Sequence, residues 1–233
     1  MIQKNIYTPK KKTERESGIP STFPFKCYSP AKDIPADEPE ILIGMDSGVS
    51  NTAFAYVELI RDYETGAVID FKFGDAYYFL EELNKLAFQM DKQIYLAEQY
   101  FNLFSYKRVL SLTFELLPLN STKDATTLKN LIDTQTTTDI IRTLAYILNH
   151  YYVPVPAKSI KYCFTGNGEA DKKDMCETAY RMTGDERLLT NDHMADSFGM
   201  CFYSFIQKIK EDHVYRNAPI PEKYAHMDWN FKS

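Results

Sequence analysis

The stretch over residues 41–59, ILIGMDSGVSNTAFAYVEL, constrains the fold more than any other part of the chain. Its first five residues are apolar and predict a buried strand, which ends on the carboxylate of Asp46. Residues 47–51 read as a turn, and residues 52–59 predict a second strand that forms a hairpin with the first. An acid at the end of a central strand is expected to face a cleft. The alternative is that Asp46 only fixes the turn with its side-chain oxygens.

The rest of the pattern alternates between strands and helices. A third strand is predicted over residues 68–78, and a short segment over 93–97 predicts a further strand that ends in Glu98. The last strand is predicted over 152–155. Helices are predicted over 80–90, 123–150, 172–183 and 191–209, and a short helix or turn over 157–163. This order predicts an α/β fold, a mixed five-stranded sheet flanked by helices.

The two ends of the chain differ in composition from its centre. Residues 1–40 hold six of the eleven prolines, and residues 1–32 carry seven basic and two acidic side chains, a net charge of +5. Because the whole chain has a net charge of −5, a basic arm is joined to an acidic body. We therefore divide the chain into a basic, Pro-rich arm (1–39), a globular domain (40–210) and a C-terminal tail (211–233). The arm is either a DNA-binding segment or a solvated tail with no partner.

The cysteines and the hydropathy bear on the compartment. Cys27, Cys163, Cys176 and Cys201 show no C-x-x-C spacing, which argues against a zinc ribbon and favours reduced thiols in the cytoplasm. An apolar run of about 18 residues, which a membrane span needs, is not found. A cytoplasmic protein with no membrane partner is expected.

The start of the last predicted helix holds a second group of candidate ligands. Asn191 or Asp192 can cap this helix, and His193 and Asp196 stand at i and i+3, on one helical face. Such a face can bind a divalent cation, with Asp192 as a further candidate. The alternative is a capping acid beside a surface histidine.

Taken in order, these motifs resemble the RuvC Holliday junction resolvases of the RNase H-like nuclease superfamily. Asp46 resembles the family's first acid, residues 98–101 (EQYF) its second acidic motif, and residues 194–197 (MADS) its terminal Ala-Asp-Ala helix. Residues 156–161 and 165–172 resemble its Gly-x-Gly segment with flanking lysines. The resemblance covers about residues 40–210. Glu115 is interpreted as lying in a helical setting, outside the motif, and the extra segments suggest a phage or viral enzyme.

The resemblance implies a metal-dependent nuclease. Asp46, Glu98, His193 and Asp196 are the expected catalytic residues and ligands of two Mg²⁺ or Mn²⁺ ions. Two such ions, about 3.5–4 Å apart, would bind the scissile phosphate of a four-way DNA junction. His193 is expected to bind a metal ion or to transfer a proton. The presence of a histidine at this motif position leaves the preference between Mg²⁺ and Mn²⁺ open.

The same resemblance predicts the partners. DNA phosphates are expected to contact lysines beside the Gly-x-Gly segment: Lys158, Lys161, Lys172 and Lys173. Phe101 is expected to stack on a base at the branch point, or else to be a core aromatic. Symmetric cutting of a four-way junction calls for a C2 homodimer, with the helix over residues 123–150 as its interface and residues 102–121 as a possible addition.

Three other interpretations stay open. One is a less selective RNase H-like nuclease for flaps, forks or other branched DNA. Another is an actin-like or sugar-kinase ATPase, whose phosphate loop also begins with Asp-x-Gly, although 233 residues is short for that fold. The third is a non-enzymatic protein that binds junctions.

Overall fold

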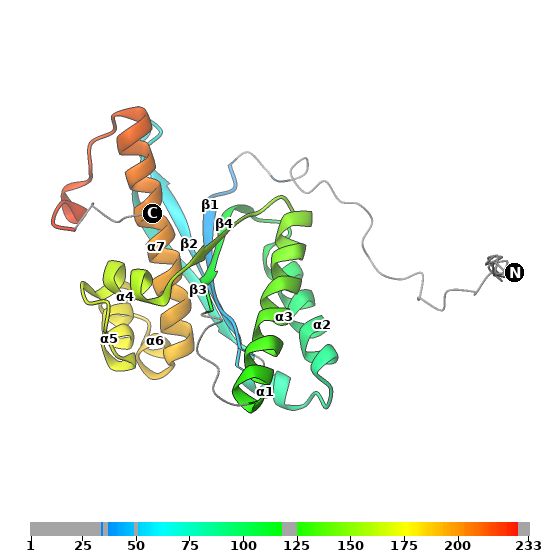
Figure 1. Ribbon diagram of the computed structural model, residues 1–233. Helices are drawn as coiled ribbons and strands as arrows, with labels where there is room; N and C mark the ends of the chain where they lie inside the picture. Colours follow the sequence, from blue (N-terminus) through cyan, green and yellow to red (C-terminus); the bar gives the residue numbers. More distant parts are fainter. Residues whose placement is uncertain (1–33, 35–36, 49–50, 118–124, 228–233) are drawn as a thin grey trace, which may run out of the picture.

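A computed structural model describes residue 34 and residues 37–48, 51–117 and 125–227. The predicted arm therefore lies almost wholly outside the described residues, as does part of the 102–121 segment. A five-stranded sheet forms the centre of the molecule (Figure 1). Its strands are β1 (Glu40–Asp46), β2 (Ala53–Arg61), β3 (Val68–Tyr78), β4 (Arg108–Glu115) and β5 (Tyr151–Val155).

The sheet is mixed, with the strand order β3-β2-β1-β4-β5. β1 pairs with β2 and β2 with β3 in antiparallel fashion, as the predicted hairpins require. β4 runs parallel to β1, and β5 runs parallel to β4. Parallel neighbours need crossover connections, and helices supply them here. The predicted fold class, an α/β fold with a mixed five-stranded sheet flanked by helices, is confirmed.

One face of the sheet is covered by the long helix α7 (Asp192–Arg216) (Figure 1). α4 (Ala157–Thr165), α5 (Lys172–Thr183) and α6 (Glu186–Thr190) complete this layer. Gly44 of β1 allows α7 to approach closely, because a Cβ at this position would collide with the carbonyl oxygen of Ser197. α7 is therefore fixed against the middle of the sheet at a position where only glycine fits.

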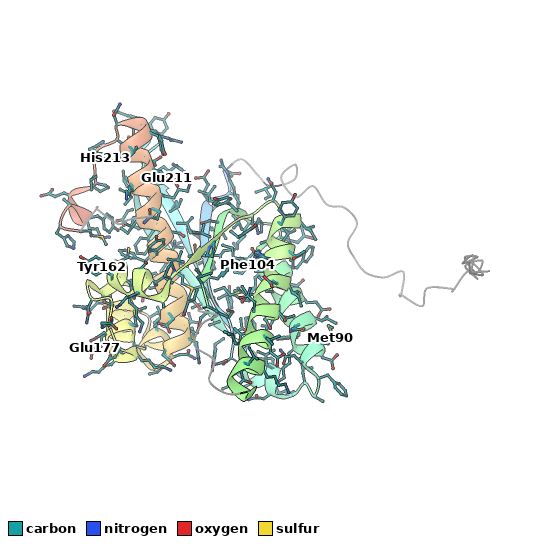
Figure 2. All side chains as sticks on the ribbon, viewed as in Figure 1. Met90, Phe104, Tyr162, Glu177, Glu211 and His213 are labelled. Carbon is teal, nitrogen blue, oxygen red and sulfur yellow. The ribbon has the colours of Figure 1, made fainter. Side chains whose placement is uncertain are left out.

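The opposite face is covered by α1 (Leu80–Asn84), α2 (Gln89–Phe104) and α3 (Ala125–Ile147) (Figure 1). Ile41, Ile43 and Met45 of β1 are fully buried in the core on this side, and Phe104 of α2 lies in the same core (Figure 2). Leu42 belongs to the core on the α7 side. Because side chains alternate along a strand, Asp46 shares the face of Leu42 and Gly44, which is the α7 face.

The structure corrects two predicted elements. The helix predicted over residues 80–90 is interrupted, since α1 ends at Asn84 and α2 begins at Gln89. The predicted strand over residues 93–97 is wrong, since these residues lie inside α2. The buried residues of α2 are Gln93, Leu96, Tyr100 and Phe104, a spacing of three and four that is typical of a helix. The fourth strand lies instead at β4, which was not predicted.

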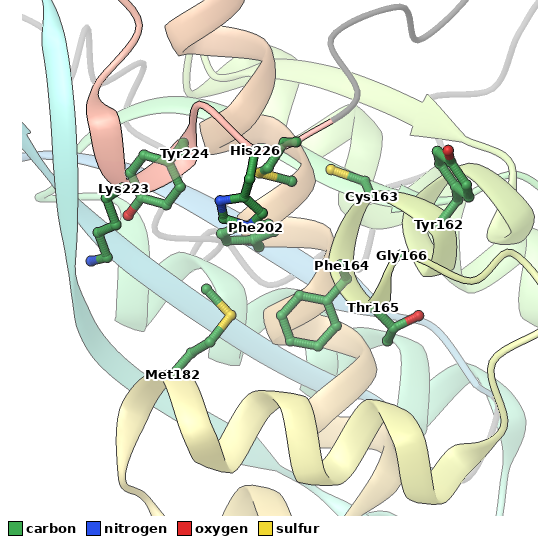
Figure 3. Close-up of a pocket in the computed structure, with 11 residues that line it drawn as sticks. Tyr162, Cys163, Phe164, Thr165, Gly166, Met182, Phe202, Lys223, Tyr224 and His226 are labelled. Atoms are coloured by element: carbon green, nitrogen blue, oxygen red, sulfur yellow. The ribbon is translucent and has the colours of Figure 1, made fainter.

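The chain continues beyond α7 and folds back onto it. The predicted boundary after residue 210 falls within α7, and Tyr224 of the 3₁₀ helix η2 (Glu222–Tyr224) is buried against Phe205. This return closes a pocket of about 570 Å³ between α4 and the C-terminal segment, with Phe164, Met182 and Phe202 on its walls (Figure 3). The division into domain and tail stays a prediction.

No helix within the described part of the chain is long and apolar enough to cross a membrane.

Candidate active site

Asp46 and Glu115 end two adjacent parallel strands. The register pairs Met45 with Phe114, so the two acids come next on β1 and β4. Thr113, two residues before Glu115, forms a hydrogen bond with Ser204 of α7. Glu115 therefore shares the α7 face of the sheet with Asp46.

The first turn of α7 brings His193 and Asp196 to these strand ends. The side chain of Asn191 caps the helix by accepting a hydrogen bond from the backbone N–H of Met194, at 3.1 Å. Ser197 joins the helix to the strand, because its Oγ accepts a hydrogen bond from the backbone N–H of Asp46 at 3.1 Å. The helix start and the strand end are thus held together by direct hydrogen bonds.

His193 contacts Asp46 directly. Its Nδ1 lies 2.6 Å from Oδ2 of Asp46, and its Nε2 lies 2.8 Å from Nδ2 of Asn51. The ring also stacks on Tyr78 of β3, with 5.4 Å between the ring centres and 17° between the planes. The hydrogen bond with Asp46 raises the pKa of His193.

The acids influence one another strongly. Burial, together with the charges of Asp46, Asp192 and Glu115, raises the pKa of Asp196 to about 7. Burial, and then the charge of Asp46, also raises the pKa of Glu115. The two strand ends and the first turn of α7 thus bring the carboxylates of Asp46, Glu115 and Asp196 close enough for their charges to influence one another.

Lys161 is a basic residue whose charge acts on two acids of this site. Its charge lowers the pKa of both Asp196 and Glu115, against the effect of burial. Its Nζ donates a hydrogen bond to the carbonyl oxygen of Ala170 at 2.8 Å, which holds α4 against the loop before α5. Lys161 is therefore positioned beside the acids by the predicted Gly-x-Gly segment.

The other predicted lysines are more exposed. Lys172 pairs with Asp192 at the start of α7, and the hydrogen bond with Asp192 raises the pKa of Lys172. Lys158 pairs with Glu169, and Lys173 lies 3.6 Å from Glu177. Lys172 therefore lies at the edge of the site.

Comparison with known proteins gave matches among solved structures. No family pattern matches the sequence, and no curated protein matches it. The Thermus thermophilus RuvC structure aligns with a TM-score of 0.57 at 12% identity, over 73% of this chain and 96% of that one. T. thermophilus RuvC in complex with its Holliday junction substrate aligns equally well, with a TM-score of 0.57 at 11% identity, over the same shares of the two chains. This chain has the RuvC fold. The yeast mitochondrial Holliday junction resolvase Ydc2 aligns with a TM-score of 0.49 at 15% identity, over 81% of this chain and 86% of that one.

Within this RuvC fold, the structure does not bring Glu98 to a strand end. Glu98 is exposed in the middle of α2, a helix on the face of the sheet opposite α7. Phe101, three residues on, packs against the core beneath α2 and α3. The premise that put Phe101 beside the metals, a strand ending at Glu98, is therefore wrong.

Glu115 takes the place that was expected for Glu98. Its interpretation as a residue in a helical setting is wrong, because it ends β4. One signal in the sequence could have identified Glu115. The run from Val109 to Phe114 is mostly apolar or β-branched and is followed directly by the acid Glu115, just as residues 41–45 are followed by Asp46. A parallel strand buried on both faces gives such a run without clean alternation.

The side chains suit a hard divalent cation by their chemistry. Asp46, Glu115 and Asp196 offer carboxylate oxygens, the donors that Mg²⁺ and Mn²⁺ prefer. Among the described residues, no group of three or more His, Cys, Asp or Glu side chains is arranged to hold a metal ion. The raised pKa of Asp196 fits a site that needs a cation, because burial and neighbouring acids disfavour its charged form.

Proposed function

We propose that this chain is a metal-dependent endonuclease that cuts four-way DNA junctions by symmetric phosphodiester hydrolysis, a Holliday junction resolvase. The observation that carries the proposal is the meeting of Asp46, Glu115 and Asp196 on the α7 face of a RuvC fold. The T. thermophilus RuvC that shares this fold has been solved with a Holliday junction substrate, which supports the choice of DNA. Roles in DNA recombination and repair follow from this chemistry.

Asp46, Glu115 and Asp196 would hold the cations. Two Mg²⁺ or Mn²⁺ ions in such a site would supply charge for the scissile phosphate and lower the pKa of bound water. The strands fix two of the three carboxylates, so little motion of the backbone is needed to present them. Asp192 is held by Lys172, which assigns it to the rim of the site.

The chain's own basic side chains would orient the DNA. Lys161 lies beside the acids, where it can contact the phosphate next to the scissile one. Lys158, Lys172 and Lys173 extend this positive charge along α4 and α5. The acidic body, with its overall charge of −5, would otherwise repel DNA.

Symmetric cutting requires two sites, and we assign the dimer interface to α3. Its outer surface exposes several large apolar side chains: Leu128, Ile132, Tyr146 and Ile147. Apolar groups that one chain leaves in water are typical of a contact with another chain. α3 also contacts the active-site loop, since Thr138 donates a hydrogen bond to Ser47 at 2.9 Å.

A substrate panel tests the proposal. Purified protein is incubated with a synthetic four-way junction, a fork, a flap and a linear duplex, each in Mg²⁺, in Mn²⁺ and in EDTA. We expect paired nicks in the four-way junction only when a divalent cation is present, and a dimer by light scattering. Equal cutting of forks and flaps would indicate the less selective nuclease. Tight binding without cutting in either metal would indicate a non-enzymatic junction-binding protein.

A further inference from the structure

Both ring nitrogens of His193 have partners in this structure. Nδ1 lies 2.6 Å from Oδ2 of Asp46, and Nε2 lies 2.8 Å from the amide nitrogen of Asn51. An amide nitrogen can only donate, so Nε2 accepts this hydrogen bond. Nδ1 therefore carries the ring proton and donates a hydrogen bond to Oδ2 of Asp46. In this arrangement neither nitrogen has a lone pair free for a cation.

The neighbours of His193 hold the ring in this orientation. Tyr78 stacks on one face of the imidazole, 5.4 Å away and nearly parallel. Asn51 lies in the loop that joins Asp46 to β2. The hydroxyl of Thr52, a fully buried residue, donates to the carbonyl oxygen of Gly48 at 2.7 Å and ties the two ends of that loop together.

Gly48 gives independent evidence that the place of the Asn51 amide matters. A Cβ at Gly48 would collide with the side-chain oxygen of Asn51. The absence of a side chain at residue 48 is therefore what leaves room for the amide beside His193. The turn after Asp46 thus serves to place Asn51, as well as to join β1 to β2.

We propose that His193 is a positioning residue for Asp46 and that Asn51 and Tyr78 hold it in that role. The imidazole fixes the plane of the Asp46 carboxylate through Oδ2 and does not itself coordinate a cation. The inference rests on the proposed function only in taking Asp46 as a cation ligand. It assigns roles to Asn51, Tyr78 and Gly48, and it replaces the expectation that His193 ligates.

The metal-free protein provides the first test, which does not depend on nuclease activity. Long-range ¹H–¹⁵N spectra of the histidine side chains, assigned with His193→Gln, report which ring nitrogen carries the proton. We expect a protonated Nδ1 and an unprotonated Nε2 in the wild type. Asn51→Leu should alter these signals, whereas Asn102→Leu, at an exposed position on α2, should leave them unchanged. A protonated Nε2 with a free Nδ1 would overturn the proposal.

The second test uses bound Mn²⁺ as a spectroscopic probe. Electron spin-echo modulation detects a nitrogen bonded directly to Mn²⁺, and we expect no such signal from ¹⁵N-histidine-labelled wild type. A direct nitrogen coupling that disappears in His193→Ala would overturn the proposal. If Mn²⁺ does not bind to the wild type at all, the proposed function fails, and the metal-free spectra still decide the arrangement of His193.

The variants of the supporting residues complete the experiment. Asn51→Leu and Gly48→Ala should each lower kcat about 10–100-fold and leave the KM for the junction nearly unchanged, which is the usual range when a partner of a metal ligand is lost. Tyr78→Leu should act in the same direction, with the fully exposed Tyr63→Leu as its control. Rates equal to those of the Asn102→Leu and Tyr63→Leu controls would show that these residues do not position His193.

Discussion

Asp46 and Glu115 stand side by side at the ends of two parallel strands, one residue beyond the paired residues Met45 and Phe114. A parallel pair brings the carboxyl ends of both strands to the same edge of the sheet. Two acids at this edge, facing a helix that carries a third, form a site that a rigid backbone holds in place. The proposed chemistry depends on this relationship more than on any single residue.

Asp196→Asn is expected to stabilise the metal-free protein. The pKa of Asp196 is about 7 in the folded state and about 3.8 in the unfolded state, so the folded state binds the extra proton between these values. The protonated Asp196 side chain contributes stability to the folded state below pH 4, and this contribution is lost as the pH rises through 7. At pH 8 in EDTA, the variant should gain about 1–3 kcal/mol in the free energy of unfolding.

Urea unfolding at pH 4 and pH 8, in EDTA, measures this effect. The gain should be confined to the higher pH, and saturating Mg²⁺ should stabilise the wild type more than the variant. A variant that is less stable than the wild type at both pH values would contradict the assignment of Asp196 to a crowded acidic site.

His150 is expected to destabilise the protein in acid. Burial lowers its pKa to about 4, and its Nδ1 lies 2.8 Å from the Tyr100 hydroxyl. Between pH 6.5 and pH 4 the unfolded state holds the extra proton, so stability falls as the pH is lowered through this window. The loss should be about 2–3 kcal/mol, opposite in sign to the Asp196 effect.

The difference in unfolding free energy between the wild type and His150→Gln isolates this contribution. The advantage of the wild type should shrink from pH 7.5 to pH 4. His226→Gln, at an exposed position, serves as the control and should show no such trend. An advantage that is independent of pH would mean that His150 is not buried in its neutral form.

Lys161→Met should reduce junction cutting far more than Lys173→Met. Lys161 acts on two of the acids, whereas Lys173 forms an exposed pair with Glu177 at 3.6 Å. A charged contact to phosphate is worth about 1.5–3 kcal/mol, so a loss of about 10–100-fold in kcat/KM is expected at Lys161. Loss of its charge should also raise the pKa of Asp196 and of Glu115. The cleavage rate should therefore begin to rise at a higher pH than in the wild type. Equal rates and equal pH profiles in the two variants would remove Lys161 from the site.

Several elements were predictable because local signals mark their ends. The strand over residues 68–78 follows Gly66, which has a positive φ, and the helix over 172–183 begins with a capping box at Asp171 and ends at Gly184. The start of α7 could likewise be found from Asn191 and Asp192. These signals depend on a few adjacent residues, so the sequence displays them directly.

The fourth strand could not be found in the same way. The five residues over 93–97 look like a strand in isolation, and only the longer spacing from Gln93 to Phe104 indicates a helix. β4 is buried on both faces, so its pattern lacks the alternation of an exposed strand. The error placed the second acid of the proposed site at Glu98 instead of Glu115, whereas Asp46, His193 and Asp196 do lie near one another in the structure.

Phe101→Ala should act on stability and not on the opening of the junction. Phe101 packs against the core beneath α2 and α3, so the change should cost about 1–3 kcal/mol in unfolding free energy, less than a fully buried phenylalanine. Rates of cutting, corrected for the folded fraction, should change equally for an intact junction and for one with pre-opened base pairs. A selective slowing on the intact junction would restore the role of Phe101 at the branch point.

The most direct measurement compares Glu115→Gln with Glu98→Gln on a synthetic four-way junction in Mg²⁺. The two variants make the same chemical change, one at the end of β4 and one on the exposed side of α2. Circular dichroism and junction binding in EDTA confirm that both variants fold and bind. We predict that Glu115→Gln loses at least about 100-fold in cleavage rate, since a lost cation ligand removes several kcal/mol of transition-state stabilisation, while Glu98→Gln cuts like the wild type. Normal cutting by Glu115→Gln, or loss of cutting in Glu98→Gln alone, would contradict the assignment of the active site.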